Sequence, residues 1–282
     1  MARVAIAQLA PVLGDLERNL STHLDRIESA REQGADLIVF PELSLTGYFL
    51  KDLTADMAMG SDHPVLTRLA EASRDIDIVA GFIALEDDHA TIAAGYWSKG
   101  RQVHVHHKAY LPTYGMFEEG RFVTAGTRLR AFDGPLGRSA MLICEDLWHP
   151  STVGIMSADG ADLLIGIAAS PARGFTGDRP DSARAYEQMT EVYARLYGLN
   201  VIFANRVGFE DGIGFWGGSR IVDGFGNEIA RAPYFEEALL VADLDLTASS
   251  RAQRIMPLTR DERPELTIAE LQRVLTHRAE RT

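Results

Sequence analysis

Short apolar segments on either side of an amphipathic segment constrain the fold of this 282-residue chain more than any other feature. The segments RVAIAQLA at 3–10 and DLIVF at 36–40 are almost entirely apolar and too short for ordinary helices. Such segments are typical of strands that are buried on both faces. Between them, apolar residues recur at helical spacing from Leu16 to Ile27, and Asp15 stands in position to cap that helix. A strand, a helix and a second strand in this order predict a layered α/β protein.

The same alternation continues to the end of the chain. Further strands are predicted at 75–83, 91–97, 102–108, 139–144, 161–168, 200–207, 218–223 and 238–246. Helices are predicted near 63–74 and before residue 200, and one face of the second carries Met189, Val192, Tyr193 and Leu196. No repeat, low-complexity tract or linker divides the sequence, so residues 1–250 are expected to form one domain. Residues 251–282 are expected to form a tail that can contact a partner subunit.

Composition and charge exclude several classes of protein. The net charge is −12, from 28 basic and 40 acidic residues, which opposes binding to the phosphate backbone of a nucleic acid. The sequence holds no apolar run of about 18 residues, so no membrane helix is expected. The apolar run at the start is too short for a signal peptide, and a single cysteine forms no intrachain disulfide. These observations predict a cytoplasmic protein.

Residues capable of chemistry stand at the ends of three predicted strands. Glu42 follows the strand at 36–40, Lys108 ends the strand at 102–108, and Cys144 ends the strand at 139–144. Open α/β sheets place their functional crevice at the carboxyl ends of strands. Each residue also has a purely structural interpretation, because acids and lysines at strand ends are usually solvated and a free cysteine is commonly buried and inert.

Histidines near these positions suggest two other kinds of site. His104, His106 and His107 could bind a metal, but alternate strand residues face opposite sides, so the three do not form one ligand set and no metal site is expected. His149 could form a dyad with Cys144, although no third group that would orient this histidine is evident. The alternative base is a carboxylate, and Glu42 is the candidate.

These three residues together can break a carbon–nitrogen bond. Cys144, on a sharp turn between a strand and a helix, would be the nucleophile. Glu42 would take the thiol proton and return it to the leaving amine. Lys108 and the backbone N–H of Glu145 would stabilise the oxyanion of the tetrahedral intermediate. This chemistry proceeds through a thioester and requires no metal or organic cofactor.

Five segments, in order, resemble the nitrilase superfamily of carbon–nitrogen hydrolases. They are VAIAQLAPVLGDLERNL, GADLIVFPELSLTGY, HHKAYLPTYGMFEEGRF, LICEDLWHP and GGSRIVDGFGNEIARA. The resemblance identifies the family's Glu, Lys and Cys as Glu42, Lys108 and Cys144, and its second, orienting Glu as Glu119 rather than Glu118. It also implies a four-layer-forming α-β-β-α sandwich, a homodimer or higher homo-oligomer paired across its helices, and a tail that reaches the neighbour.

Within that superfamily, CEDLW looks most like the glutaminase domain of glutamine-dependent NAD synthetases. The resemblance implies that Tyr48, Tyr114, Glu145 and Ser170 line the amide pocket, although each could instead be structural. Nitrilases usually carry Trp after the nucleophile, and Glu145 in its place favours amides over nitriles. The sequence lacks the SGGxDS loop of a synthetase, so ATP-dependent amide transfer is not expected, and it lacks the YNS of many relatives.

The sequence therefore predicts an amidase that releases ammonia from a small linear carboxamide. One alternative with the same chemistry is an ammonia-donating subunit for a separate synthetase. A nitrilase is a second alternative, which Glu145 weakens. A third is a non-catalytic member of the superfamily that acts as a binding protein.

Overall fold

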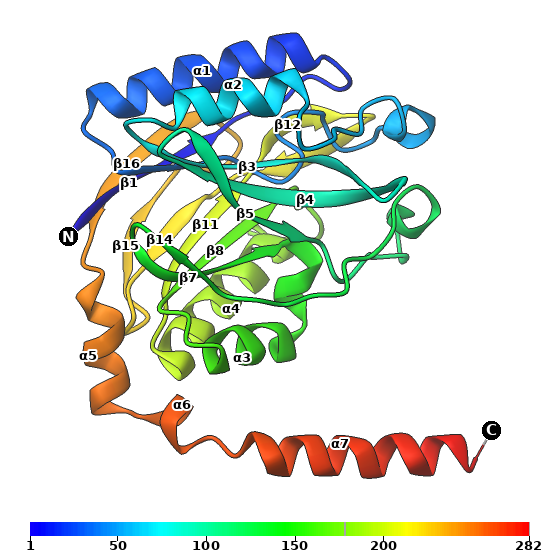
Figure 1. Ribbon diagram of the computed structural model, residues 1–282, viewed down its shortest axis with the longest axis vertical. Coiled ribbons are helices and arrows are strands. Elements are labelled where there is room, and N and C mark those ends of the chain that lie inside the picture. The colour runs from blue at the N-terminus through cyan, green and yellow to red at the C-terminus, as the bar shows by residue number, and fades with distance from the viewer. Residues whose placement is uncertain (178, 282) are drawn as a thin grey trace.

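Two six-stranded sheets form the centre of the molecule (Figure 1). The computed structural model describes residues 1–177 and 179–281. The strands of the first sheet are, in order, β16 (Ala238–Leu244), β1 (Ala2–Gln8), β2 (Leu37–Val39), β3 (Asp77–Glu86), β4 (His89–Ser98) and β5 (Arg101–His107). Those of the second are β15 (Glu228–Arg231), β14 (Arg220–Val222), β11 (Asn200–Asn205), β8 (Leu163–Ala168), β7 (Gly137–Ile143) and β6 (Phe132–Gly134). Two short hairpins pair β9 (Phe175–Thr176) with β10 (Arg179–Pro180) and β12 (Val207–Glu210) with β13 (Ile213–Trp216).

Helices cover the outer face of each sheet (Figure 1). The first sheet carries α1 (Leu16–Glu32) and α2 (Pro64–Ala72), and the second carries α3 (Pro150–Ala158) and α4 (Asp181–Tyr197). The chain ends in α5 (Thr247–Ile255), α6 (Leu258–Asp261) and α7 (Pro264–Ala279). Three short 3-10 helices are η1 (Lys51–Thr54), η2 (Glu119–Arg121) and η3 (Cys144–Trp148). The predicted layered α/β fold, with helices outside two packed sheets, is confirmed.

Strand β1 shows why its sequence is nearly continuous in apolar residues. Val4 and Ile6 pack in the core between the two sheets, whereas Ala5 and Ala7 pack in a second core under the helices. Both faces of the strand are therefore buried, and burial of this apolar surface is the main favourable contribution to folding. The N-cap of α1 is also as predicted, because the Asp15 carboxylate accepts the N–H of Arg18 at 3.1 Å.

The register of the strands brings several strand ends to one edge. Strands β1, β2 and β3 run parallel, with Val4 opposite Leu37 and Leu37 opposite Asp77. In the second sheet, β7, β8 and β11 are also parallel, with Leu163 paired to Ser139 on one side and to Asn200 on the other. The carboxyl ends of β2, β5, β7 and β8 carry the segments that form the site described below.

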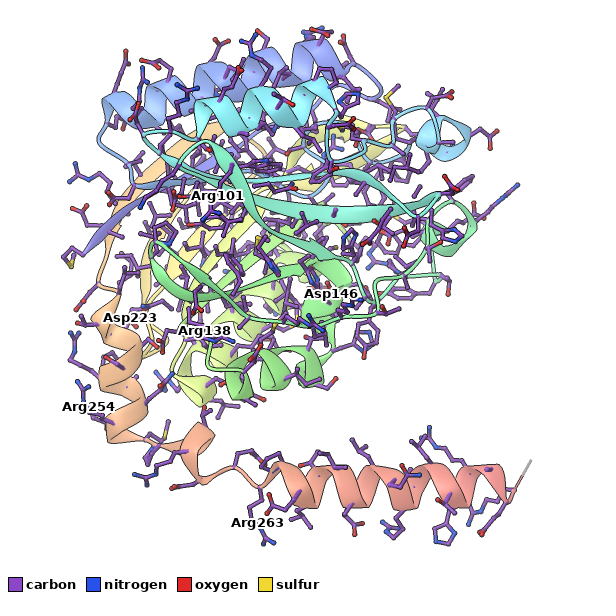
Figure 2. All side chains as sticks on the ribbon, viewed as in Figure 1. Arg101, Arg138, Asp146, Asp223, Arg254 and Arg263 are labelled. Carbon is purple, nitrogen blue, oxygen red and sulfur yellow. The ribbon has the colours of Figure 1, made fainter. Side chains whose placement is uncertain are left out.

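The C-terminal segment leaves the body of the molecule. Helix α7 runs clear of the two sheets in Figure 1, and Figure 2 shows its side chains standing out around the helix beyond Arg263. Within the described ranges α7 has no buried residue. The expected boundary at residue 251 falls inside α5, which spans Thr247–Ile255. No helix in the described part of the chain is long and apolar enough to cross a membrane.

Candidate active site

A buried lysine joins two carboxylates at the edge of the first sheet. Lys108 Nζ lies 2.7 Å from Glu42 Oε1 and 2.7 Å from Glu119 Oε1. Both Lys108 and Glu42 are 0% exposed, so neither is the solvated strand-end residue that its position alone would suggest. Burial acts to lower the pKa of Lys108, but Glu119 and Glu42 outweigh it and raise that pKa well above its ordinary value. The lysine is therefore a fixed positive charge.

Both sheets hold the Glu42 carboxylate. Glu42 follows β2, and its Oε1 is bound by Lys108, which follows β5 of the same sheet. Its Oε2 accepts the backbone N–H of Ala169, at the end of β8 in the second sheet, at 2.7 Å. Each carboxylate oxygen has a second lone pair, so Glu42 can still accept a proton while it keeps both bonds.

Cys144 stands at the turn between β7 and η3. Its φ is +48°, in the left-handed region that few residues other than glycine adopt. The chain turns there from a strand into η3 and then α3, so the buried sulfur occupies the position of a nucleophile elbow. Sγ lies 3.3 Å from the hydroxyl oxygen of Tyr186, on α4.

Lys108, Glu42 and Glu119, here called the lysine cluster, change the pKa of the Cys144 thiol. Burial raises the pKa of Cys144 well above its ordinary value, and Glu42 raises it further. Lys108 and the hydrogen bond from Tyr186 act in the opposite direction but do not prevail. Cys144 is therefore held as a thiol, and it would need a base to remove its proton before it could act as a nucleophile.

Glu119 carries one bonded and one unbonded oxygen. Its Oε1 accepts hydrogen bonds from Lys108 and from the Tyr48 hydroxyl, the latter at 2.5 Å. Its Oε2 is buried and has no hydrogen-bond partner among the residues that the structure describes. Burial raises the pKa of Glu119 to about 7 against the opposing effect of Lys108. Glu118, the neighbouring acid, is exposed, so the structure brings Glu119 and not Glu118 into contact with Lys108.

The four expected pocket residues lie in three places. Tyr48 belongs to the cluster through Glu119, and a cavity of about 320 Å³ borders both residues. Tyr114 is half-exposed and donates its hydroxyl hydrogen to Glu145 at 2.8 Å. Ser170 follows Ala169, and its backbone N–H donates to Asn205 at 2.9 Å. Their roles toward a substrate stay predictions.

A buried ion pair supports the loop that carries Tyr48. Arg206 Nη1 lies 2.7 Å from Glu210 Oε2, and the Arg206 guanidinium covers the ring of Phe215 at 4.1 Å. Glu210 Oε1 in turn accepts the backbone N–H groups of Tyr48 and Phe49 at 2.7 and 2.6 Å. This pair, which no sequence motif indicates, fixes the Tyr48 loop against the β12–β13 hairpin.

A second group that the sequence analysis missed is Asp146, labelled in Figure 2. Its buried carboxylate accepts the backbone N–H groups of Ile143, Ala109 and Tyr110, each at 3.0 Å, and binds His106 Nε2 at 2.8 Å. Burial opposes its charge, but these hydrogen bonds, led by the one from His106, hold the pKa of Asp146 below its ordinary value. One carboxylate thus binds the residue before Cys144 and the residue after Lys108.

The other histidines take structural positions. His104 stacks on Phe132, and His107 contacts Glu86 at 3.3 Å. His149 stacks on Tyr110, and the hydrogen-bond partner of Cys144 among the described residues is Tyr186 rather than His149. Within residues 1–177 and 179–281, no three His, Cys, Asp or Glu side chains are grouped so as to hold a metal ion. A larger cavity, of about 680 Å³, lies along β5 rather than at the lysine cluster.

Comparison with known families agrees with this geometry. The sequence profile of the family described as Carbon-nitrogen hydrolase matches residues 3–254. The chain belongs to the carbon-nitrogen hydrolase family. The match includes all three strand ends that carry Glu42, Lys108 and Cys144, and the resemblance of the five sequence segments is confirmed.

Among the carbon-nitrogen hydrolases, curated relatives include glutamine-dependent NAD(+) synthetases. That of Thermotoga maritima is 33% identical over 263 residues, which are 92% of this chain and 44% of the relative. That of Acinetobacter baylyi is 30% identical over 90% of this chain and 46% of the relative. This carbon-nitrogen hydrolase chain thus spans less than half the length of these relatives.

A solved structure similar to this carbon-nitrogen hydrolase over nearly its whole length is an amidase from Nesterenkonia sp. It is 26% identical, covers 95% of each chain and superposes with a TM-score of 0.79. A mutant of the Nesterenkonia sp. AN1 amidase shows covalent addition of the acetamide moiety of fluoroacetamide at its active-site cysteine. This second structure is 25% identical, with a TM-score of 0.80 over 95% of this chain and 96% of the other.

Proposed function

We propose that this carbon-nitrogen hydrolase is an amidase that converts a small linear carboxamide into a carboxylate and ammonia. The observation that carries the proposal is the buried Lys108, which is bound to both Glu42 and Glu119 in a cluster whose charges act on a cysteine at positive φ. Buried charges are costly, and ionisable groups in strongly perturbing environments cluster at functional sites. An acid, a cation and a thiol together supply the base, the oxyanion partner and the nucleophile of acyl transfer.

In the acylation step, Glu42 accepts the proton of the Cys144 thiol. The sulfur electron pair attacks the amide carbonyl carbon, and the carbonyl oxygen becomes an oxyanion that Lys108 and the N–H of Glu145 stabilise. When the tetrahedral intermediate collapses, the carbon–nitrogen bond breaks. Glu42 gives its proton to the departing nitrogen, which leaves as ammonia, and a thioester on Cys144 remains.

In the deacylation step, a water molecule attacks the thioester while Glu42 accepts one of its protons. Collapse of the second tetrahedral intermediate breaks the carbon–sulfur bond and releases the carboxylic acid. The proton on Glu42 returns to the sulfur of Cys144, so the enzyme is restored with no net change. Glu119 would orient the substrate through its free Oε2, which can accept an N–H of the carboxamide.

The contacts around Cys144 favour an amide over a nitrile. A carboxamide offers N–H donors, and both Glu119 Oε2 and the Glu145 carboxylate are acceptors. A nitrile offers no donor to either group. Tyr114 and the guanidinium of Arg173, which lies over the Tyr114 ring at 5.9 Å, would bound the outer side of the pocket near Glu145.

A panel of amides tests the proposal. Purified protein should release ammonia from at least one of a set that includes glutamine and simple aliphatic amides, and more slowly from the matching nitriles. Cys144→Ala should abolish release, and exposed Glu118→Gln should leave it unchanged. In the variant Glu42→Gln, fluoroacetamide should lose fluoride and add one acetamide group to Cys144, detected as a mass shift on the peptide that contains it. Ammonia release that survives Cys144→Ala would overturn the mechanism.

A second candidate function has the same chemistry but a different recipient for the ammonia. The match to the N-terminal part of glutamine-dependent NAD(+) synthetases favours a glutaminase that delivers ammonia to a separate synthetase. This candidate predicts preference for glutamine and activity that increases when a synthetase is added. Equal hydrolysis of glutamine with and without a synthetase would reject it.

We propose as well that the protein forms a homodimer in which the tail contacts the neighbouring subunit. On α7, Ile268, Leu271 and Leu275 fall on one side of the helix and are 67%, 58% and 57% exposed. An apolar stripe that the body of its own subunit leaves uncovered can be buried by a second copy of the chain. Isologous pairing of two identical surfaces is the commonest form of assembly.

A further inference from the structure

We propose that the Tyr186 hydroxyl is a further catalytic group, which donates a hydrogen bond to the Cys144 sulfur whenever that sulfur carries negative charge. Tyr186 Oη lies 3.3 Å from Cys144 Sγ. This inference rests on the proposed function of Cys144 as the nucleophile. Neither the strand-end pattern nor the family resemblance indicated Tyr186, because it comes from the middle of α4.

The Tyr186 ring is held so that its hydroxyl cannot turn away from the sulfur. The side chain is buried, and its ring stacks on Phe203 with centroids 4.8 Å apart. The edge of Trp148 packs against it at 5.5 Å, and Trp216 lies at 6.0 Å. Aromatic neighbours on several sides leave the ring little rotational freedom, so the position of the hydroxyl is set before a substrate binds.

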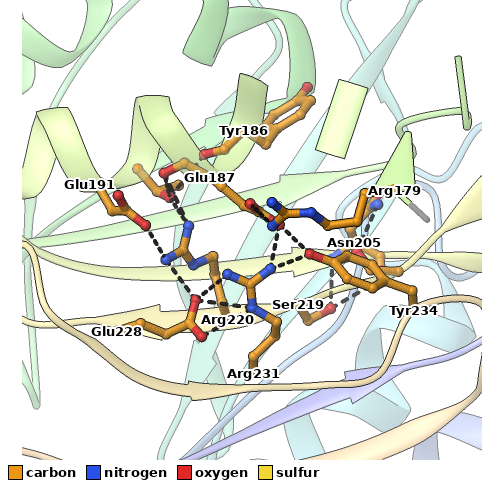
Figure 3. A network of polar contacts seen from close by, with 12 residues as sticks. Arg179, Tyr186, Glu187, Glu191, Asn205, Ser219, Arg220, Glu228, Arg231 and Tyr234 are labelled. Atoms are coloured by element: carbon orange, nitrogen blue, oxygen red, sulfur yellow. Dashed lines mark hydrogen bonds and ion pairs between the residues drawn. The ribbon is translucent and has the colours of Figure 1, made fainter. Parts of the chain in front are cut away.

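The next residue of α4 anchors the helix itself. Glu187 binds Arg179 at 2.8 Å and also contacts Arg231 and Tyr234. Figure 3 shows Glu187 reaching into this arginine cluster while the Tyr186 ring points the other way. Helix α4 is thus fixed by charged contacts at Glu187 and by aromatic packing at Tyr186. Together these contacts hold the Tyr186 hydroxyl beside the Cys144 sulfur.

The sulfur needs a donor that Lys108 does not supply. Two carboxylates, Glu42 and Glu119, act on Cys144 and disfavour a thiolate. An ammonium group has three N–H donors, and Lys108 uses two of them for those same carboxylates. The third would serve the substrate oxyanion. Tyr186 is then the neutral donor available to the sulfur, and a hydrogen bond to a charged group contributes more than one between neutral groups.

The direction of this hydrogen bond changes during the reaction. With a protonated Cys144, either the thiol or the phenol can donate. Once Glu42 holds the proton, the sulfur has no hydrogen and can only accept, so Tyr186 must donate. Burial raises the pKa of Tyr186 well above its ordinary value, so the phenol keeps its hydrogen throughout. No proton leaves Tyr186, and the same bond stabilises the sulfur again when the carbon–sulfur bond breaks.

Two tyrosine variants of the same helix test the proposal. Tyr186→Phe removes the hydroxyl and keeps the ring packing. Tyr193→Phe is a matched control, because Tyr193 is also buried on α4 and donates its hydroxyl hydrogen to the Leu147 carbonyl of the same turn at 2.7 Å. Both variants lose one hydrogen bond beside η3, but only the first loses a bond to the sulfur.

The measurement is the rate at which iodoacetamide alkylates Cys144, followed from neutral to alkaline pH. Tyr186→Phe should move the midpoint of this profile to higher pH by about one unit, equivalent to a roughly tenfold slower reaction at neutral pH. Tyr193→Phe should leave the midpoint at the wild-type value. An unchanged midpoint in Tyr186→Phe, or an equal shift in Tyr193→Phe, would overturn the proposal.

A second variant tests the proposal even if Tyr186→Phe fails to fold. Replacement of Tyr186 by 3-fluorotyrosine keeps the hydroxyl, alters the size of the ring little and makes the phenol a stronger donor. The alkylation midpoint should then move to lower pH, and no shift or a shift to higher pH would count against the proposal. Alkylation requires no amide turnover. If no amide is hydrolysed but the midpoints shift as stated, the proposed function fails while the role of Tyr186 toward the thiolate stands.

Discussion

Glu42 Oε2 lies 2.7 Å from the backbone nitrogen of Ala169, so the main chain of the second sheet holds a carboxylate that belongs to the first. The other oxygen of Glu42 is bound by Lys108 at 2.7 Å. Both partners are donors. Glu42 must therefore present an acceptor on each oxygen, which a carboxylate does and an amide does not.

This arrangement predicts a large effect of Glu42→Gln. One of the two donors would face the amide NH₂ of glutamine, and the base that removes the Cys144 proton would be lost. We expect kcat/KM to fall by about 10³-fold, within the range of general-base contributions. Cys144 should still be labelled by fluoroacetamide, which separates loss of the base from loss of the nucleophile. Amide hydrolysis within tenfold of the wild-type rate would contradict the assignment of Glu42 as the base.

Much of the fold could be predicted from local sequence because the strands are buried on both faces. The apolar runs of β1 and β2 and the Asp15 cap of α1 depend on near neighbours. Helix α4 was harder to interpret. Of the apolar residues expected to share a face, Tyr193 is buried but Val192 and Leu196 are exposed. The inward face of this helix includes the polar Thr190, whose hydroxyl accepts a hydrogen bond from the buried Arg220 of β14, and periodicity alone does not indicate this contact.

Some residues of the candidate site could likewise be predicted from local sequence, and others could not. Glu42, Lys108 and Cys144 could be selected as candidates from the sequence because each stands shortly after the end of a recognisable strand. The hydrogen bond between Asp146 and His106 joins positions 40 residues apart, and it depends on how the turn after Cys144 aims one side chain. No local sequence pattern predicts the orientation of the Asp146 side chain. Tyr186 was missed for a related reason, because its contact depends on the rotation of α4 against the second sheet.

Asp146→Asn should destabilise the protein in a pH-dependent way. The carboxylate accepts four hydrogen bonds, and an asparagine side chain has a single acceptor oxygen, so buried donors would be left unpaired. We expect a loss of about 2–4 kcal/mol in the free energy of unfolding at neutral pH, measured by urea titration. Asp133→Asn, at an exposed ion pair, is the control and should change stability by less than about 1 kcal/mol.

The pH dependence of that loss follows from the lowered pKa of Asp146. A carboxyl whose pKa is lower in the folded state stabilises the fold above its unfolded pKa, ordinarily 3.8, and this contribution is lost as pH falls through the folded value. The difference between wild type and Asp146→Asn should therefore be full at neutral pH and shrink in acid. A difference that stays constant from neutral pH into acid would show that Asp146 is not ionised in the fold.

Glu119→Gln should have the opposite dependence on pH. The pKa of Glu119 is raised from 4.5 to about 7 in the folded state, so between these values the folded protein holds a proton that the unfolded chain releases. Wild-type stability should therefore fall as pH rises across this interval. The glutamine variant lacks this decline, so its stability relative to wild type should rise from pH 4.5 to pH 7 in urea titrations. Parallel pH profiles would contradict the raised pKa.

The proposed dimer contact predicts which faces of α7 tolerate a charge. At 100° per residue, Leu271 and Leu275 lie about 40° apart, together with Ile268, whereas Leu266 lies on the opposite side of the helix. Leu271→Glu with Leu275→Glu should convert a dimer into a monomer, because a carboxylate buried in an apolar interface without a partner costs several kcal/mol. Leu266→Glu adds one carboxylate to the opposite side of the same exposed helix and should leave the dimer intact. Light scattering coupled to size-exclusion chromatography gives the mass of each variant. Dissociation by Leu266→Glu, or a dimer that survives both substitutions on the stripe, would place the subunit contact elsewhere.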